Sequence, residues 1–526
     1  MDTINKSRGL TRRGFLLGAA ATGAVASMGA LAGCASGEEK KSEPAESSNW
    51  DASYDAVVVG AGFAGLATAI TAAGAGASVV VIDNAPEEYA GGNSRVCGQL
   101  VWSPEDTKVA KDYFLEINHG YTDDIPDDML NAFVEEVSQN KTWIEDEIGV
   151  PMKQRAYLEY PAAANIAAAE GCFCPEAGML GAQLWEPMLE YALDLGIEVL
   201  YEHEAVELIL DSDSSVAGVL VTTPEGEKRI QGNKGVALCC GGFENNAVMK
   251  SNYLKSPGRP IGTPYNTGNG IKMSQAIGAD LWHMHTAMSP YAFDYLDYNA
   301  PGFEDNAISV SNNAAGGAIW LDKYGKRFMD EGRDSQHGLG YEAVLYEDSN
   351  KLETPRIPLW VVTDDTDIQT AGLFSTTSYI NFHGGWKPSA GCVDEIEKGW
   401  VIKADTVEEL ASKMEVDAAT LAETFERYNA FAAAGADEDF GRSAEKMRVL
   451  EPPFYAVSAH PALLNTDGGP RRDADGHVVH VSGEPIAKLY SAGELGSIWA
   501  HHYQGSGNVG ECLAFGRIVG RNIAAS

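Results

Sequence analysis

The chain has 526 residues, of which 75 are acidic and 38 basic, so its net charge is −37. A surface this acidic repels phosphate backbones, and we expect no nucleic-acid binding. With 44% hydrophobic residues, a chain of this length can bury more than one core and is consistent with two domains.

The N-terminal residues have the features of an export signal. Two arginines stand in TRRGFLL (Thr11 to Leu17), an Ala/Gly-rich apolar stretch follows, and LAGC ends at Cys34. These runs resemble a twin-arginine signal and a lipoprotein cleavage site. We expect a signal over residues 1–33, twin-arginine export, and a lipid anchor at Cys34 on the outer face of the cytoplasmic membrane. Residues 34–53 would be a solvated tether. A transmembrane anchor is the alternative, although its Ala/Gly content makes the stretch weakly hydrophobic.

The segment from Asp55 to Asp83 predicts a dinucleotide-binding turn. An apolar strand leads into a glycine-rich turn and an Ala-rich helix, and a second apolar strand ends in an acid. Such glycines allow a tight turn, close approach of a pyrophosphate and close packing of helix on strand, while an acid about 20 residues on accepts ribose hydroxyls. An ordinary strand-to-helix turn is the alternative. The parts are the strand Ala56 to Val59, Gly60, Gly62, Gly65, the strand Ser78 to Ile82 and Asp83.

Further motifs follow in order along almost the whole chain. They include GGNSRVCGQL, VALCCGGFENN, NTGNGIKMSQAIGA, GKRFMDE, LYSAGELGS and GNVGECLAFGRIVG. With these motifs the chain resembles the flavoprotein family of fumarate reductases, succinate dehydrogenases and 3-ketosteroid Δ1-dehydrogenases. The resemblance implies an α/β fold, in which a Rossmann-like FAD-binding domain (54–285 and 466–526) is interrupted by an α+β capping domain (286–465).

The resemblance also implies which residues hold FAD. Val206 would contact the adenine side through its backbone, and Asn508 and Val509 would open the last helix beneath the flavin. Asn269 stands where the family usually has Asp. No His occurs in SRVCGQL, where succinate dehydrogenase relatives attach FAD covalently, so we expect non-covalent FAD. The implied set is Gly60, Gly62, Gly65, Asp83, Asn93, Ser94, Gly98, Val206, Asn269, Glu494, Asn508 and Val509.

The cationic residues with which fumarate reductases hold a dicarboxylate are replaced here. The corresponding runs are TAMSP (Thr286 to Pro290), LNTDGG (Leu464 to Gly469) and HYQGSG (His502 to Gly507), with Tyr503 at the position of the Arg. Fumarate reduction is therefore not expected. The run from Tyr503 to Gly507 instead resembles the Tyr-x-Gly-x-Gly run of 3-ketosteroid Δ1-dehydrogenases, which implies that the Tyr503 hydroxyl and the Gly507 N–H hold a carbonyl oxygen.

A proton relay is expected soon after GKRFMDE. Arg333 is the preferred candidate and His337 the other, while Ser335 holds the slot in which relatives have Arg or Tyr. Arg327 is read as an ion-pair partner of Asp330 or Glu331.

We thus expect an FAD-dependent oxidoreductase that reduces a carbon–carbon double bond conjugated to a carbonyl, with electrons from a membrane-associated donor such as a cytochrome c or a quinol oxidase. A 3-ketosteroid Δ1-dehydrogenase is the first alternative, and a non-catalytic binding lipoprotein on a flavin fold is the second. The eight cysteines contain no Cys-x-x-Cys, so no metal site is predicted, although an iron–sulfur role stays open.

Overall fold

The computed structural model describes residues 49–155, 160, 171–255, 258–288, 291–293, 308–309, 317–333, 343–370, 373 and 388–526. Asn49–Ser526 form one compact unit. The expected signal, Cys34 and most of the tether lie outside the described residues. Within the described part of the chain, no helix is long and apolar enough to cross a membrane.

A parallel sheet forms the centre of the nucleotide-binding part. β1 lies between β2 and β9, with β6 beyond β2 and β22 beyond β9, and each of these neighbours pairs in parallel. Strands buried on both faces need continuous apolar runs, which explains the sequence of β1 and β2. The parallel strands are β1 (Ala52–Val59), β2 (Val79–Ile82), β6 (Glu198–Leu200), β9 (Gly226–Leu238) and β22 (Pro485–Ser491), and β21 (His477–Val479) adds an antiparallel strand beside β22.

Polar and apolar residues alternate from Glu207 to Phe243, with breaks at Asp211 to Ser215 and Pro224 to Gly226, which predicts strands and hairpin turns. In the structure this region belongs to an antiparallel meander. β7 (Glu204–Leu210) pairs with β8 (Val216–Thr223), and β8 pairs with β9. The breaks fall at the predicted turns, so this prediction is confirmed. Side chains of β1 alternate between two cores, with Val58 in the cluster that includes the long helices and Val57 in the cluster that includes the meander.

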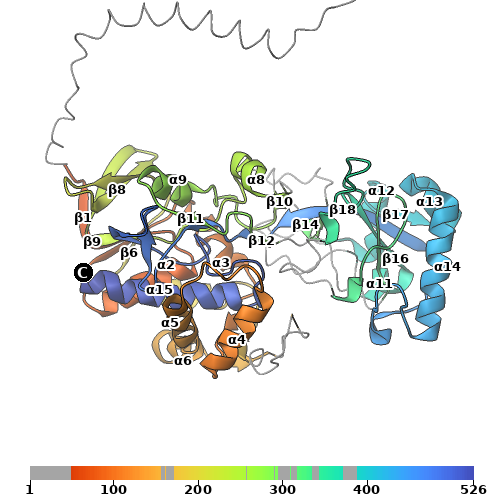
Figure 1. Ribbon diagram of the computed structural model, residues 1–526, viewed down its shortest axis with the longest axis horizontal. Coiled ribbons are helices and arrows are strands. Elements are labelled where there is room, and N and C mark those ends of the chain that lie inside the picture. The colour runs from red at the N-terminus through yellow and green to blue at the C-terminus, as the bar shows by residue number, and fades with distance from the viewer. Residues whose placement is uncertain are drawn as a thin grey trace, which may run out of the picture. The chain divides into compact units, whose positions relative to one another are not determined.

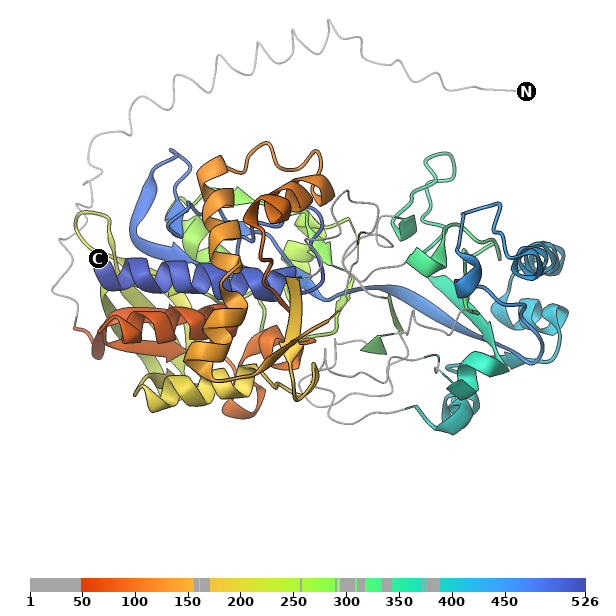
Figure 2. The ribbon, with the colours of Figure 1, turned by 90° about the horizontal axis from the view of Figure 1, so that it is seen from below.

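Two helices cross closely beside the sheet. Figures 1 and 2 show α2 (Phe63–Gly74) alongside α15 (Gly507–Ala525). A Cβ atom on Gly516 would lie only 2.7 Å from the carbonyl oxygen of Ala64, so the two backbones approach more closely than larger residues permit. The helix predicted to begin at Asn508 begins at Gly507, one residue earlier.

Other helices and short strands surround this centre. They are α3 (Gly92–Val96), α4 (Thr107–Ile117), α5 (Asp127–Val137), α6 (Asn140–Trp143), α7 (Trp185–Asp194), α8 (Ala247–Tyr253), α9 (Asn269–Ala276), β3 (Val101–Trp102), β4 (Met152–Gln154), β5 (Cys172–Pro175), β11 (Leu281–Trp282) and β20 (Gly469–Pro470).

A second sheet is organised by one long strand. β18 pairs with β10, β13, β16 and β17, and β16 also pairs with β15. Leu421, Phe425 and Tyr428 stand at i, i+4 and i+7, which predicts a helix over Ala419 to Ala433 with an apolar stripe. The helix is observed as α14 with these three residues buried, so this prediction is confirmed. The elements are β10 (Arg259–Pro260), β13 (Tyr291–Phe293), β14 (Ile308–Ser309), β15 (Ile319–Leu321), β16 (Leu359–Asp364), α11 (Asp365–Thr370), α12 (Val393–Glu397), β17 (Ile402–Ala404), α13 (Val407–Met414), α14 (Ala418–Ala434) and β18 (Phe454–Leu463).

The predicted domain boundaries fall at a two-stranded ladder. β12 (Ala287–Met288) pairs antiparallel with β19 (Asn465–Thr466). The two places at which the chain passes from one predicted domain to the other therefore lie next to each other. The division into an FAD-binding and a capping domain stays a prediction, because the structure describes Asn49–Ser526 as one unit.

The contact between the first turn and α2 yields a stability prediction. A Cβ on Gly65 would lie 1.8 Å from the carbonyl oxygen of Gly60, which is backbone and cannot rotate away. We expect Gly65→Ala to lower the free energy of unfolding by about 2–3 kcal/mol, as overpacking does. Urea unfolding measures the change. Gly74→Ala in the same helix is the control, because its Cβ meets nothing within 4 Å and should be neutral or stabilising. Equal stability of Gly65→Ala and the wild type would contradict the packing.

Candidate active site

The turn between β1 and α2 is shaped for a phosphate group. Gly60 has a φ of 108°, and its N–H donates to the carbonyl of Ile82. Gly62 is the N-cap of α2 and has no side chain to fill the helix end. The N–H groups of the first helical turn and the helix dipole together favour an anion at this place. The residues therefore fit a dinucleotide pyrophosphate.

Asp83 lies against this turn at the end of β2. Its side chain is buried, and its two oxygens accept the N–H groups of Ala61 and Ala85, each at 2.9 Å. Burial raises the pKa of Asp83, although these hydrogen bonds oppose the shift. Asp83 thus stands at the strand end where ribose recognition is expected, and its contact with ribose stays a prediction.

The glycines and polar residues from Gly91 to Ser94 predict a flexible polar turn, but in the structure this stretch is the start of the short helix α3. Its side chains are fixed by other segments: Ser94 Oγ accepts the N–H of Phe63 at 2.9 Å, and Asn93 Nδ2 donates to Glu244 Oε1 at 2.9 Å. These bonds order a segment for which the sequence indicated only flexibility. Gly98 follows this helix in irregular, half-buried backbone.

The predicted adenine-side residues lie at the start of the meander. Val206 is the extra residue of a β-bulge, because Ala205 faces Val221 and Glu207 faces Leu220. Its backbone therefore stands outside the ladder pairing, as a backbone contact to adenine would require. Asn269, the first residue of α9, donates from Nδ2 to Glu204 Oε1 at 2.5 Å and so connects α9 to β7.

Three predicted flavin contacts meet at the N-terminus of α15. Asn508 Nδ2 donates to Glu494 Oε1 at 3.3 Å, and Val509 follows in the first turn. The Ser506 side chain at the N-cap does not cap the helix, so the N–H groups of Asn508 and Val509 in the first turn receive no side-chain cap. A helix end of this kind favours negative charge, as on the pyrimidine edge of a reduced flavin.

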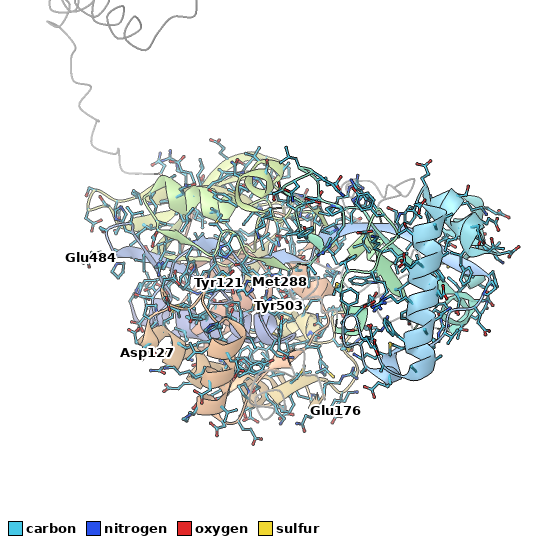
Figure 3. All side chains as sticks on the ribbon, turned by 45° about the vertical axis from the view of Figure 1, so that its right-hand side comes forward. Tyr121, Asp127, Glu176, Met288, Glu484 and Tyr503 are labelled. Atoms are coloured by element: carbon cyan, nitrogen blue, oxygen red, sulfur yellow. The ribbon has the colours of Figure 1, made fainter. Side chains whose placement is uncertain are left out.

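Tyr503 lies in the buried core beside the ladder of β12 and β19. The side chain is 3% exposed and belongs to the same apolar cluster as Met288, close to which it lies in Figure 3. Its hydroxyl donates to Asn465 Oδ1 at 2.8 Å, and Asn465 Nδ2 donates to Asp467 Oδ1 at 2.8 Å. A phenol, an amide and an acid thus form one hydrogen-bonded chain.

Gly507 is four residues farther on and opens α15. Its N–H donates to the carbonyl of Gln504 at 2.5 Å, so in this structure the group closes a tight turn. The Gln504 side chain is held in turn by the hydroxyl of Tyr113 at 2.6 Å. Any hydrogen bond from Gly507 N–H to a substrate would have to replace or share the bond to Gln504.

Arg333 ends the short helix Glu331–Arg333, and only its backbone is described. Buried ion pairs fix the segment before it: Arg327 Nη2 lies 2.7 Å from Glu331 and 2.9 Å from Asp437. The expected pairing of Arg327 with Glu331 is confirmed, while Asp437 was not anticipated. Ser335 and His337 lie outside the described residues.

Four buried acids surround the site. Burial raises the pKa of each above its usual value, and for Asp467 and Glu494 the rise is large. Arg472 forms a fully buried ion pair with Glu511, whereas Glu244 is held by Asn93 and Asn266. The four acids are Glu244, Asp467, Glu494 and Glu511.

His501 and His502 form a turn just before Tyr503. The Asn118 side chain accepts both of their backbone N–H groups, and the His501 ring stacks on Tyr121 with centroids 4.2 Å apart. Burial lowers the pKa of His501 to about 4, with further lowering from nearby His502. His501 is therefore neutral at pH 7 and supplies no fixed cation beside Tyr503.

Several residues that build the site were not singled out from the sequence. Gln99 accepts the N–H groups of Leu184 and Trp185, and the Trp185 indole donates to Ala61 O of the first turn. Only Glu244 left a usable signal, as an acid directly after the apolar strand and the glycine pair of VALCCGGFENN. Across the described residues, no group of three or more His, Cys, Asp or Glu could hold a metal ion.

Comparisons with known proteins agree with this geometry. The family model described as FAD binding domain (FAD_binding_2) matches residues 55–509. The digoxin reductase of Eggerthella lenta is 27% identical over 98% of this chain and 97% of its own length. The 3-oxosteroid 1-dehydrogenase of Mycolicibacterium smegmatis is 27% identical over 90% of this chain and 97% of its own length.

The fold also has a solved counterpart. The 3-ketosteroid Δ1-dehydrogenase of Sterolibacterium denitrificans superposes with a TM-score of 0.76 and 21% identity, over 90% of this chain and 99% of that chain. The α/β fold and the FAD cofactor predicted from the sequence are thereby confirmed. The chain belongs to the FAD binding domain family and is an FAD-dependent oxidoreductase of the fumarate reductase type.

Proposed function

We propose that the protein reduces a carbon–carbon double bond conjugated to a carbonyl, in an enone, an enoate or an unsaturated lactone. The observation that carries this proposal is the buried phenol of Tyr503, held by Asn465 where fumarate reductases have an arginine. A neutral hydroxyl is a good donor to a carbonyl oxygen that gains negative charge during reduction. Similarity to a protein named digoxin reductase supports the same direction of reaction.

The charges around Tyr503 argue against fumarate as the substrate. A dicarboxylate needs fixed cations to offset its loss of hydration. Asp467 is instead a buried acid, His501 is neutral, and the Thr286 hydroxyl donates to the carbonyl of Ala500. A neutral or singly charged acceptor suits these surroundings better than a dianion.

The residues of this chain would divide the work as follows. Bound FAD, once reduced, supplies the hydride for the β-carbon. Tyr503 holds the carbonyl oxygen, with the Gly507 N–H as second donor once it leaves Gln504, and Arg333 supplies the proton at the α-carbon. FAD is held without a covalent bond, because the segment from Ser94 to Leu100 contains no histidine.

Tyr503→Phe tests the role of the phenol. The substitution keeps the ring but removes the donor, and removal of one such donor costs roughly 10²–10³-fold in turnover. We expect that loss in steady-state assays with a chemically reduced dye as electron donor, with FAD content unchanged. Tyr490→Phe is the matched control, since that hydroxyl bonds to Ser526 at the C-terminal end of α15 and its loss should leave turnover intact. Full activity of Tyr503→Phe would remove the phenol from the mechanism.

A 3-ketosteroid Δ1-dehydrogenase is the second candidate, favoured by the relative from Mycolicibacterium smegmatis. The same oxyanion contact would then serve the reverse reaction. Assays of one preparation in both directions separate the two, with unsaturated carbonyl compounds plus a reduced dye, and with 3-ketosteroids plus an oxidised dye. We expect faster reoxidation of the reduced enzyme by unsaturated carbonyls. Turnover confined to 3-ketosteroid oxidation would select the alternative.

We also propose that the protein is exported by the twin-arginine pathway and anchored by lipid at Cys34, where it receives electrons from a membrane-associated cytochrome c or quinol oxidase. Cys34→Ser removes the thiol that carries the lipid, and stable attachment to a bilayer needs more than one acyl chain or an equivalent second signal. We expect Cys34→Ser to move the protein from the membrane fraction to the soluble exported fraction, measured by immunoblot. Cys97→Ser is the control. Membrane retention of Cys34→Ser would contradict the anchor.

A further inference from the structure

The hydrogen-bonded chain from Tyr503 through Asn465 to Asp467 has two possible directions. The carbonyl oxygen and the nitrogen of an amide side chain have nearly the same shape, so the two 2.8 Å contacts of Asn465 also fit an amide turned by 180°. In one direction Tyr503 donates to Asn465. In the other direction Asn465 donates to the oxygen of Tyr503.

The two directions differ in what Tyr503 can offer a substrate. A phenol has a single proton. When Tyr503 donates to Asn465, that proton is occupied and cannot bind a carbonyl oxygen. When Asn465 donates to Tyr503, Asn465 no longer accepts the phenol proton, which can then be donated to a substrate, and the phenol oxygen is still satisfied.

The surroundings of Asp467 determine which direction is favoured. Asp467 is 0% exposed, and its Oδ2 has no hydrogen-bond partner within the described parts of the chain. The charged groups that act on it most strongly are the acids Glu511 and Glu244, and Glu511 is already paired with Arg472. A buried carboxylate with an oxygen unpartnered and acids around it would be very costly, whereas a neutral carboxylic acid needs only one good bond.

We propose that Asp467 is a positioning residue: as a neutral acid it donates to Asn465, which turns the amide so that Asn465 donates to Tyr503 and leaves the phenol proton for the carbonyl of the substrate. This inference rests on the proposed function of Tyr503. Asp467 itself touches Asn465 and not the substrate in this arrangement. The neutral acid thus sets the direction of both hydrogen bonds, from Asp467 to Asn465 and from Asn465 to Tyr503.

Infrared difference spectroscopy tests the neutral acid without any substrate. The spectrum of the FAD-loaded wild type at pH 7 minus that of Asp467→Asn should contain the carbonyl stretch of a protonated carboxylic acid. The same subtraction with Asp213→Asn, an exposed acid whose pKa is lowered by hydrogen bonds from Ser215, should contain the bands of an ionised carboxylate. Carboxylate bands in the Asp467 difference would overturn the proposal.

The turnover of paired variants tests the direction of the hydrogen bonds between Asp467, Asn465 and Tyr503. Asp467→Asn can still donate to Asn465 and should keep kcat within about threefold of the wild type, whereas Asp467→Leu cannot donate and should lose roughly 10²-fold, in the range of a lost oxyanion donor. Both substitutions act on the same step, the donation of the Tyr503 phenol proton to the substrate. The double variant Tyr503→Phe with Asp467→Leu should therefore be no slower than Tyr503→Phe alone.

The outcomes separate this inference from the proposed function. Equal losses in Asp467→Asn and Asp467→Leu, or additive losses in the double variant, would overturn the positioning role while Tyr503 remains the donor. A wild type that reduces no unsaturated carbonyl would instead refute the proposed function, and the infrared result would still stand for Asp467.

Discussion

The close crossing of α2 and α15 is the constraint on which the site depends. Gly516 allows the backbone of α15 to reach the carbonyl of Ala64, at the start of α2. Gly493 lies next to Ala64 as well, so the loop carrying Glu494 is brought to the same place. We therefore expect the two helix N-termini to serve one FAD, with the pyrophosphate at α2 and the flavin ring at α15.

In the described part of the chain, three arginines of the interior are paired with buried acids. Arg472 is paired with Glu511, and Arg327 and Arg442 are paired with Glu331, so these arginines stabilise buried acids rather than await a substrate. Under the proposed function, recognition of the substrate at Tyr503 depends on hydrogen bonds from neutral groups. Such a site suits a carbonyl that becomes negative only during the reaction, because the donors are already in place when the charge develops.

Local sequence predicted much of the frame. The first strand, turn, helix and second strand, the meander and α14 needed only apolar periodicity and glycine positions. Contacts between distant segments could not be predicted in this way. Asn465 meets Tyr503, Arg327 meets Asp437 and Asn118 meets His501 only after the chain has folded. Helix α3 was missed for the same reason, since Ser94 is fixed by the N–H of Phe63 rather than by its own neighbours.

The central claim is that a phenol, not a cation, polarises the carbonyl of the substrate. The ¹³C chemical shift of a carbonyl-labelled, non-reducible ketone bound to the oxidised holoenzyme measures this polarisation directly. The account predicts a downfield shift on binding to the wild type, and a shift close to the value in an aprotic solvent on binding to Tyr503→Phe. An equal downfield shift in both proteins would contradict it, because the donor would then be another group.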